Sequence, residues 1–465
     1  MPILGAGQQC NLNIRGKIVD ASTGVALSDA HIELKPTRIT GASDANGNFL
    51  LGNLCKGEYH VSISHLGCAP EIVFINLKKD TVITIFLFHH SELISEVDVH
   101  AHRDATNAQT TNSISVAEIV SNANKNIAQQ IENIAGVSSL NTGSGISKPI
   151  IHGLYGNRVS IINNGIAQSG QQWGNDHAPE IDPFVANHIS VIKGASALAY
   201  GGVNLGGVVL VEPADLGNEP HLHGKANYVF QTNGLGNTVN LQLEKSSKWG
   251  SWRFLGTAKL IGDRKSPNYY LTNTGNRELD FAGQYEKMIG RRWKINAYYS
   301  LFQTELGILR GSHISNSSDL EAAIGRDEPF FTSDYFSYNI AAPSQKVNHQ
   351  LFKVEFKYLI NDHQVFDFRN GLQRNNRREF DVRRGAYNDA PSLSLQQFTN
   401  FAEGVYTNQF NKSLLFKSGL QYNYVKNSND NTATDRLPLI PDYQSNQATG
   451  FLILQKELSK FFFEV

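Results

Sequence analysis

Residues 189–211 read Ile189-Ser-Val-Ile-Lys-Gly-Ala-Ser-Ala-Leu-Ala-Tyr-Gly-Gly-Val-Asn-Leu-Gly-Gly-Val-Val-Leu-Val211. Five glycines separate an apolar run at 189–192 from a second apolar run at 208–211. Glycine at this density marks backbone that takes positive φ or approaches other chain segments closely. A phosphate loop is disfavoured, because no Gly-Lys-Ser/Thr occurs and the glycines precede a strand rather than a helix. The stretch therefore predicts a glycine-rich turn that leads into a buried strand.

The residues upstream of this stretch predict a short helix followed by a hairpin. Ile127, Ile131 and Ile134 recur at i, i+4 and i+7 within 126–135, which is typical of an amphipathic helix, and Gly136 is placed as a cap. After Pro149-Ile-Ile-His-Gly-Leu-Tyr-Gly-Asn-Arg158, an Asn-Gly pair joins two apolar runs within 159–166. An Asn-Gly pair between strands favours a tight hairpin turn.

This succession resembles the plug domain of TonB-dependent outer-membrane receptors, and the resemblance covers residues 106–213. The family often has Arg where His152 stands and Pro where Ala195 stands. The resemblance implies that the plug depends structurally on Gly153, Arg158, Gly165, Lys193, Gly194, Tyr200, Gly201, Gly206 and Gly207.

Residues 214–465 follow a period of two. Apolar side chains at 352, 354, 356 and 358 alternate with Lys353, Glu355 and Lys357, for example. We expect strands near 223–231, 237–246, 251–262, 277–288, 292–303, 348–360, 363–374, 396–409, 413–425 and 448–458, and a last strand from 461. After the first hairpin, long and short connections alternate, which is how transmembrane β-barrels are built.

The predicted barrel is therefore partial. Plugged outer-membrane transporters have about 22 strands, and we expect about eleven here. An open half-barrel would leave unpaired strand edges in lipid, so we interpret the sequence as a fragment truncated at both ends. Residues 1–10 resemble the tail of a secretory signal peptide.

Residues 11–90 contain short strands at about ten-residue spacing with turn signals between them, which predicts a small β-sandwich. The carriers Gly16-Lys-Ile-Val-Asp20 and Asp44-Ala-Asn-Gly-Asn-Phe49 resemble the carboxypeptidase-regulatory-like, transthyretin-like domain. Cys55 and Cys68 lie in or near neighbouring strands, so they either pair after export or remain two free thiols. The predicted fold class is mainly β: a sandwich, an α+β plug, and the first half of a large antiparallel barrel.

The segment 91–105 is a linker between the sandwich and the plug. It contains Ser95-Glu-Val-Asp-Val-His-Ala101, which resembles the TonB box of the same receptors. By this resemblance Glu96, Val97, Asp98 and Val99 pair by strand addition with TonB, which ExbB and ExbD energise in the periplasm.

The loop Gln171-Gln-Trp-Gly-Asn-Asp-His-Ala-Pro-Glu-Ile-Asp182 brings one imidazole and three carboxylates together in sequence. Imidazole with carboxylate suits zinc and related divalent cations. The candidate ligands are Asp176, His177, Glu180 and Asp182. Asp176 and His177 also resemble the plug loop of outer-membrane zinc receptors. The alternative is structural, with Trp173 packing and the aspartates capping turns.

Composition and missing motifs exclude several classes of function. The net charge is −1 and only 18% of residues are charged, which excludes a generally basic nucleic-acid binder. No nucleophile elbow or His-Glu-x-x-His helix occurs, so we predict no enzyme and no required cofactor. We expect an outer-membrane importer of zinc, another transition metal or a metal chelate, with outer-membrane lipid around it. The alternatives are a ferric-siderophore, heme or vitamin B12 receptor, and a non-transporting adhesin or assembly protein.

Overall fold

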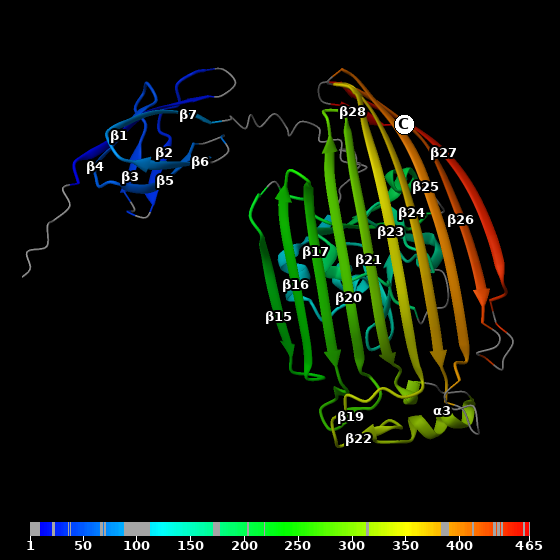
Figure 1. Cartoon of the computed structure of the whole chain (residues 1–465). Helices are drawn as coiled ribbons and strands as arrows, with labels where there is room; N and C mark the ends of the chain where they lie inside the picture. Colours follow the sequence, from blue (N-terminus) through cyan, green and yellow to red (C-terminus); the bar gives the residue numbers. More distant parts are fainter. Residues whose placement is uncertain are drawn as a thin grey trace, which may run out of the picture. The chain divides into compact units, whose positions relative to one another are not determined.

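The computed structural model describes residues 10–464, apart from 21–23, 36, 38, 66–67, 69–70, 88–111, 171–176, 202–203, 218, 313–315, 383–389, 412, 431–433, 435–437, 439 and 459–460. The chain forms two compact units, Met1–His100 and Ala101–Val465 (Figure 1). Within the described part of the chain, no helix has the length and apolarity needed to cross a membrane.

The first unit is a sandwich of two sheets. One sheet has the order β4 (Asn48–Leu54), β1 (Leu12–Asp20), β7 (Thr81–Leu87). The other has the order β3 (Ile39–Ala42), β2 (His31–Lys35), β5 (Gly57–Ser64), β6 (Glu71–Leu77). Alternate residues of these strands are buried between the sheets, among them Ile14, Ile32, Val61 and Leu77. The sandwich that the sequence predicts is therefore present.

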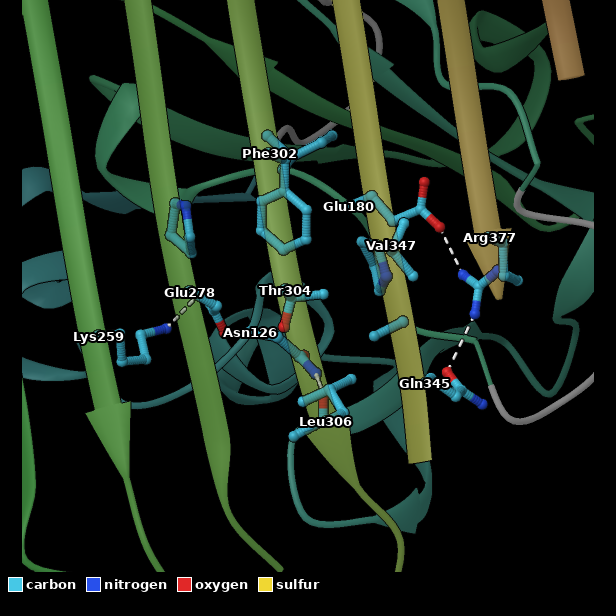
Figure 2. Close-up of a pocket in the computed structure, with 15 residues that line it drawn as sticks. Asn126, Glu180, Lys259, Glu278, Phe302, Thr304, Leu306, Gln345, Val347 and Arg377 are labelled. Carbon is cyan, nitrogen blue, oxygen red and sulfur yellow. Dashed lines mark hydrogen bonds and ion pairs between the residues drawn. The ribbon is translucent and has the colours of Figure 1, made fainter. Parts of the chain in front are cut away.

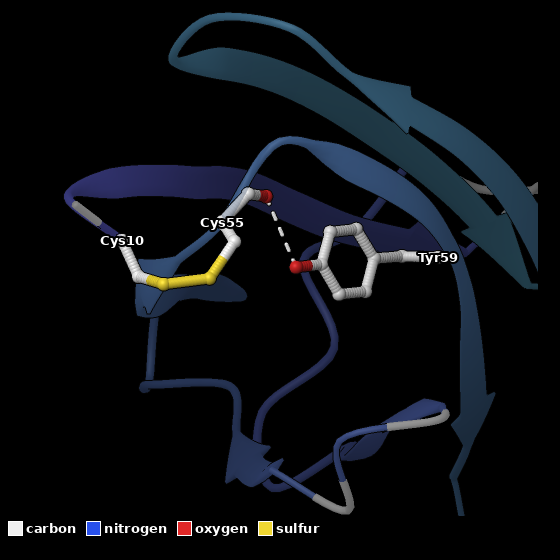
Figure 3. The surroundings of a disulfide bond; sticks show 3 residues. All are labelled: Cys10, Cys55 and Tyr59. Atoms are coloured by element: carbon white, nitrogen blue, oxygen red, sulfur yellow. Dashed lines mark hydrogen bonds between the residues drawn. A yellow bond between two sulfur atoms is a disulfide. The ribbon is translucent and has the colours of Figure 1, made fainter. Parts of the chain in front are cut away.

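The cysteine pairing differs from the one considered for the sequence. Cys10 and Cys55 form the disulfide (Figure 3), while Cys68 is not disulfide-bonded and its sulfur lies 3.3 Å from Nδ1 of His65. Cys10 precedes β1 and Cys55 follows β4, and these two strands are antiparallel neighbours with Leu12 opposite Leu54. The strand pairing thus brings the two cysteines together, and the Cys55–Cys68 pair is wrong.

The plug forms the first part of the second unit. Its five-stranded sheet has the order β12 (Ile166–Ala167), β11 (Val159–Asn163), β14 (Gly207–Glu212), β13 (His188–Ile192), β8 (Asn112–Ser115). A hairpin of β9 (Val137–Gly143) and β10 (Ile146–Ile151) accompanies it, with the helix α1 (Val116–Ser121). The Asn-Gly turn between β11 and β12 has positive φ at both residues, Asn164 and Gly165, as predicted.

The helix expected over 126–135 is shorter than predicted. It consists of one α-helical turn, α2 (Ile127–Gln130), and a 3-10 turn, η1 (Ile131–Asn133). Asn126 caps the start, since its side chain accepts the backbone N–H of Gln129. Ile127, Ile131 and Ile134 are buried in the plug core, so the periodicity identified the correct face. The helical turns end before the predicted position because Ile134 is already extended, at φ −78° and ψ 128°, and Gly136, at φ 75°, then turns the chain into β9.

An eleven-stranded antiparallel sheet follows the plug and curves around it (Figure 1). Its strands, in order, are β15 (His223–Gln231), β16 (Gly236–Ser247), β17 (Gly250–Ile261), β20 (Asn276–Ile289), β21 (Trp293–Gly307), β23 (Ser344–Asn361), β24 (Gln364–Phe380), β25 (Leu393–Asn411), β26 (Leu414–Asn429), β27 (Tyr443–Leu458) and β28 (Phe461–Glu464). All eleven coincide with strands that the sequence predicts.

The two faces of this sheet differ in polarity. In β16, Val239 and Leu241 are 40% and 55% exposed on the outer face, whereas Asn240 between them is 1% exposed and faces the plug. The same alternation in β24 exposes Phe366 and Phe368 and buries Asp367. Apolar side chains point outward and polar ones inward, as in a transmembrane barrel.

The ends of the strands form two rims. The short-turn rim carries 248–249, 290–292 and 362–363, and the long-loop rim carries 262–275, 308–343, 381–392 and 430–442. The long connections contain a small sheet of β18 (Arg264–Lys265), β19 (Tyr270–Leu271) and β22 (Thr332–Ser333), and the helix α3 (Ser317–Ile324).

Candidate functional site

The plug loop that contains the predicted metal ligands lies against the inner face of the sheet near the long-loop rim. Its C-terminal part is held by Asp182, which caps the 3-10 turn η3 (Pro183–Val185) by accepting the backbone N–H of Phe184 at 3.0 Å. The other carboxylate oxygen of Asp182 accepts the hydroxyl of Thr257 in β17 at 2.6 Å. Burial raises the pKa of Asp182 to about 6, and these two hydrogen bonds oppose that rise.

The eleven-stranded sheet is called the wall from here on. Glu180 lies deeper between the plug and this wall, and it is paired with Arg377 of β24. An oxygen of Glu180 is 2.5 Å from a guanidinium nitrogen of Arg377, and both side chains are almost fully buried. Arg377 also donates to Gln345 of β23 at 3.0 Å (Figure 2). Asn375 donates to the second oxygen of Glu180. A buried ion pair needs such additional hydrogen bonds to offset the cost of removing two charges from water.

His177 begins the described part of the loop and contacts the same strand. Its Nε2 is 2.8 Å from Glu379, two residues beyond Arg377 towards the long-loop rim. Burial lowers the pKa of His177, although the hydrogen bond to Glu379 works in the opposite direction. His177 is therefore a mostly neutral imidazole at neutral pH, which is the form that binds metal ions.

A small cavity of about 30 Å³ lies between this loop and the wall (Figure 2). The Glu180–Arg377 pair borders it on one side, and a second ion pair, Lys259 with Glu278 at 2.9 Å, borders it on the other. This volume corresponds to about one water molecule. Among the described residues, the plug therefore fits closely against the wall at this cavity.

A second contact area holds the β11–β12 hairpin of the plug. Arg369 of β24 donates to the carbonyl of Gly165 at 3.2 Å, and Lys353 of β23 donates to the side chain of Asn164 at 3.0 Å. Arg369 is itself paired with Glu403 at 3.0 Å. Two strands, β23 and β24, thus bind the plug hairpin directly, and the network extends to β25 and β26 because Gln421 of β26 donates to Glu403 of β25.

The predicted metal ligands are not gathered into one cluster. Glu180, Asp182 and His177 each bind a different wall residue, and Asp176 lies outside the described residues. Within the described part of the chain no three His, Cys, Asp or Glu side chains are placed to hold a metal ion. The structure thus gives Glu180 and Asp182 a part in seating the plug. The TonB-box-like residues Glu96, Val97, Asp98 and Val99 also lie outside the described residues.

The predicted structural residues of the plug lie around its sheet and hairpin. Lys193 donates to the carbonyl of Ala135 and so joins β13 to the chain after η1. Gly207 has φ 135°, and a Cβ there would lie 2.6 Å from the carbonyl oxygen of Ile192. Gly165 has φ 79°, and a Cβ there would collide with the guanidinium of Arg369. The remaining residues of this set are Gly153, Arg158, Gly194, Tyr200, Gly201 and Gly206, and of these Arg158 and Gly206 are joined by a backbone hydrogen bond of 2.8 Å.

Sequence reasoning missed the partners on the wall. Arg369 was visible only as an inward position of the strand predicted at 363–374, whereas Arg377 and Glu379 lay beyond its predicted end, in an expected long loop. The available signal was their charge: charged side chains are rarely buried without a partner, so a charge on the inner face of the sheet predicts a partner on the plug or a neighbouring strand.

Comparison with known proteins agrees with this geometry. Residues 103–208 match the family described as TonB-dependent Receptor Plug Domain, and residues 14–99 match the CarboxypepD_reg-like domain. The chain has the architecture of a TonB-dependent receptor. The CarboxypepD_reg-like domain lies at the N-terminal side of the plug.

The chain is also similar in fold to solved structures at low sequence identity. The siderophore receptor PirA from Acinetobacter baumannii aligns with a TM-score of 0.56 and 10% identity, over 75% of this chain and 54% of that one. The ferric enterobactin receptor PfeA gives 0.56 and 14% over 76% and 56%, and PirA from Pseudomonas aeruginosa gives 0.53 and 12% over 76% and 54%. The chain thus spans about half the length of these structures, which are receptors rather than enzymes.

Proposed function

We propose that the chain is part of an energised outer-membrane importer that takes up a transition metal or a metal chelate at the long-loop rim. The observation that carries the proposal is the seated plug. A barrel that serves only as an anchor needs no plug, whereas the buried Glu180–Arg377 pair holds this one closely against the wall. Opening a path past such a contact requires work, which argues for an energised partner.

The energy would enter through the linker. We infer that Glu96–Val99 pair with TonB in the periplasm, and that the sandwich is periplasmic as well. An extended segment suits strand addition to a partner sheet. Outer-membrane barrels have their short turns in the periplasm and their long loops outside, which supports uptake at the long-loop rim.

Uptake in the native bacterium tests the energised importer. Cells that carry the receptor are expected to accumulate the cargo, and Val97→Pro is expected to abolish uptake because proline cannot pair within a strand. Ala105→Pro, outside the proposed box, is the matched control and should retain uptake. Equal uptake by Val97→Pro and wild-type cells would contradict the proposal.

We further propose that the cargo contacts Asp176 and His177. His177 is a mostly neutral imidazole beside the long-loop rim, with one nitrogen on Glu379. Purified receptor incubated with Zn²⁺ or Cu²⁺ is expected to retain near-stoichiometric metal, and Asp176→Ala/His177→Ala to lose it. His188→Gln is the control, because His188 also pairs with a carboxylate, Glu212 at 2.9 Å, but lies in the plug sheet.

A ferric siderophore is the second candidate cargo. The similar structures PirA and PfeA are named for siderophores and for ferric enterobactin. Absence of bound metal in both the wild-type and the doubly substituted receptor, together with uptake of a ferric chelate in the same cells, would replace the free metal by the chelate.

A further inference from the structure

The outer face of the sheet at the short-turn rim carries an unusual group of aromatic side chains. Three of the four tryptophans of the chain, Trp249, Trp252 and Trp293, lie at this rim. Trp249 and Trp293 are 70% and 46% exposed. The ring of Trp293 packs against Tyr358 of the neighbouring strand, with centroids 4.5 Å apart. Amphipathic aromatic rings of this kind collect where a membrane meets water.

Cations surround these rings. The ammonium groups of Lys248 and Lys287 lie 5.5 and 5.8 Å from the centre of the Trp249 ring, so both amines approach the same indole. Lys245 pairs in register with Trp252, and Arg291 and Arg292 are exposed in the next turn. The segments 245–252 and 285–294 contain a single carboxylate, Glu286, and it is paired with Lys294 at 3.0 Å.

Two other carboxylates at this rim belong to neighbouring segments. Glu219, which follows the plug, is 3.8 Å from His221, and Asp362 lies in the next turn along the rim, between β23 and β24. The rim of β16, β17, β20 and β21 therefore carries five cationic side chains without a carboxylate partner in their own segments: Lys245, Lys248, Lys287, Arg291 and Arg292. Such a surface attracts a phosphate group.

An apolar groove begins directly beside the cations. It has a volume of about 350 Å³ and is lined by Trp252, Phe254, Phe281, Tyr285, Tyr299 and Phe352 on the outer face of β17, β20, β21 and β23. Gly283 lines the floor of the groove. A Cβ at this position would lie 3.2 Å from the ring of Phe254, so the glycine keeps this part of the groove open. The hydroxyl of Tyr285 donates to the carbonyl of Trp249 at 2.5 Å, which fixes the groove to the cationic turn.

We propose that this rim is a binding site for an anionic phospholipid. The phosphate lies between Lys248, Lys287 and the arginines of the 290–292 turn, and one acyl chain occupies the groove. Charge complementarity selects the headgroup, and the groove distinguishes a lipid from free phosphate. The inference rests on the membrane placement in the proposed function and adds a lipid class and a site.

The test is native mass spectrometry of the whole chain in detergent, titrated with phosphatidylglycerol and separately with phosphatidylcholine of the same acyl chains. Wild type is expected to retain phosphatidylglycerol about tenfold more tightly. Lys248→Gln/Lys287→Gln is expected to lose roughly tenfold in affinity for that lipid. Lys78→Gln/Lys79→Gln, which removes the same charge from the exposed β6–β7 turn of the sandwich, is the control and should bind as wild type.

Two further arms separate the parts of the site. Gly283→Leu fills the groove without changing the charge and is expected to weaken phosphatidylglycerol binding, whereas millimolar inorganic phosphate should not displace the lipid. Equal retention of the two lipids, an equal loss in the Lys78/Lys79 control, or full displacement by phosphate would each overturn the site.

Flotation with neutral phosphatidylcholine vesicles separates this inference from the proposed function. If the chain floats but shows no lipid preference, the lipid site fails alone. If neither wild type nor Lys248→Gln/Lys287→Gln associates with vesicles of any composition, the membrane placement fails as well.

Discussion

The carboxylate of Glu180 in the plug and the guanidinium of Arg377 in β24 are 2.5 Å apart where the plug meets the wall, although the two residues are 197 positions apart in the chain. This pair joins the loop that carries the candidate cargo ligands to the strand that ends at Phe380 on the long-loop rim. Any rearrangement of the plug that opens a path must break it or move it.

The first prediction concerns this pair. Arg377→Ala leaves a buried carboxylate without its partner, so we expect a loss of about 3–5 kcal/mol in the free energy of unfolding, measured by denaturant titration in detergent. Glu180→Gln/Arg377→Gln should lose less, because no charge remains buried alone. Lys346→Ala is the control: it breaks the exposed pair of Lys346 with Glu305 at 3.1 Å and should cost less than about 1 kcal/mol. Similar losses for Arg377→Ala and Lys346→Ala would contradict a structural role for the buried pair.

The second prediction concerns the pH dependence of stability. Because the pKa of Asp182 is raised to about 6 when folded, the folded chain keeps a proton there that the unfolded chain has released above pH 4. The contribution of Asp182 to stability is therefore greatest at acidic pH and declines as the pH rises from about 4 to about 6, by up to about 1.4 kcal/mol per pH unit. Asp182→Asn should remove this component of the slope while retaining an acceptor for Phe184. Unfolding curves at several pH values check it, and an unchanged slope would show that Asp182 is already ionised at low pH.

The third prediction concerns the disulfide. Alkylation of the folded, oxidised chain should modify one thiol, and alkylation after denaturation and reduction should modify all three cysteines. Cys10→Ser should destabilise the sandwich by about 2–4 kcal/mol, since the bond closes a loop with a sequence separation of 45 residues. Cys68→Ser is the control and should retain the bond in peptide mapping. A Cys55–Cys68 peptide in the map of the native protein would refute the assignment.

The fourth prediction concerns the turn of the plug hairpin. Gly165→Ala forces a side chain into a backbone with φ 79° and towards Arg369, so we expect a loss of roughly 1–3 kcal/mol in stability. Faster protease cleavage within 159–167 would accompany that loss. Gly143→Ala is the matched control, because its Cβ would meet only the side chain of Ile146 at 3.4 Å and its φ is ordinary. Equal protease sensitivity of the two variants would argue against a tight hairpin contact.

Local patterns in the sequence were sufficient for most of the architecture. The alternation in β23 and β24 predicted both strands, but it placed their long-loop ends at 348 and 374, whereas the strands run from Ser344 and to Phe380. The extra residues are mostly polar, and they are ordered because the inner face of these strand ends, through Gln345 and Arg377, contacts other protein groups. From their polarity alone, these residues were predicted to belong to loops.

Side-chain partners were beyond such patterns. The sequence grouped His177, Glu180 and Asp182 because they are near in the chain, yet each one binds a different wall residue, and two different strands supply these partners. Likewise, the disulfide follows the antiparallel pairing of β1 with β4 rather than the distance along the chain.

The sequence by itself therefore determined the elements of this protein: the sandwich strands, the plug with its Asn-Gly hairpin, and the eleven strands with one apolar face. These depend on periodicity and turn chemistry, which act over a few residues. Only the tertiary structure decided which charges face one another, which cysteines bond and where cations meet an apolar groove, because those contacts join residues that the chain keeps tens to hundreds of positions apart.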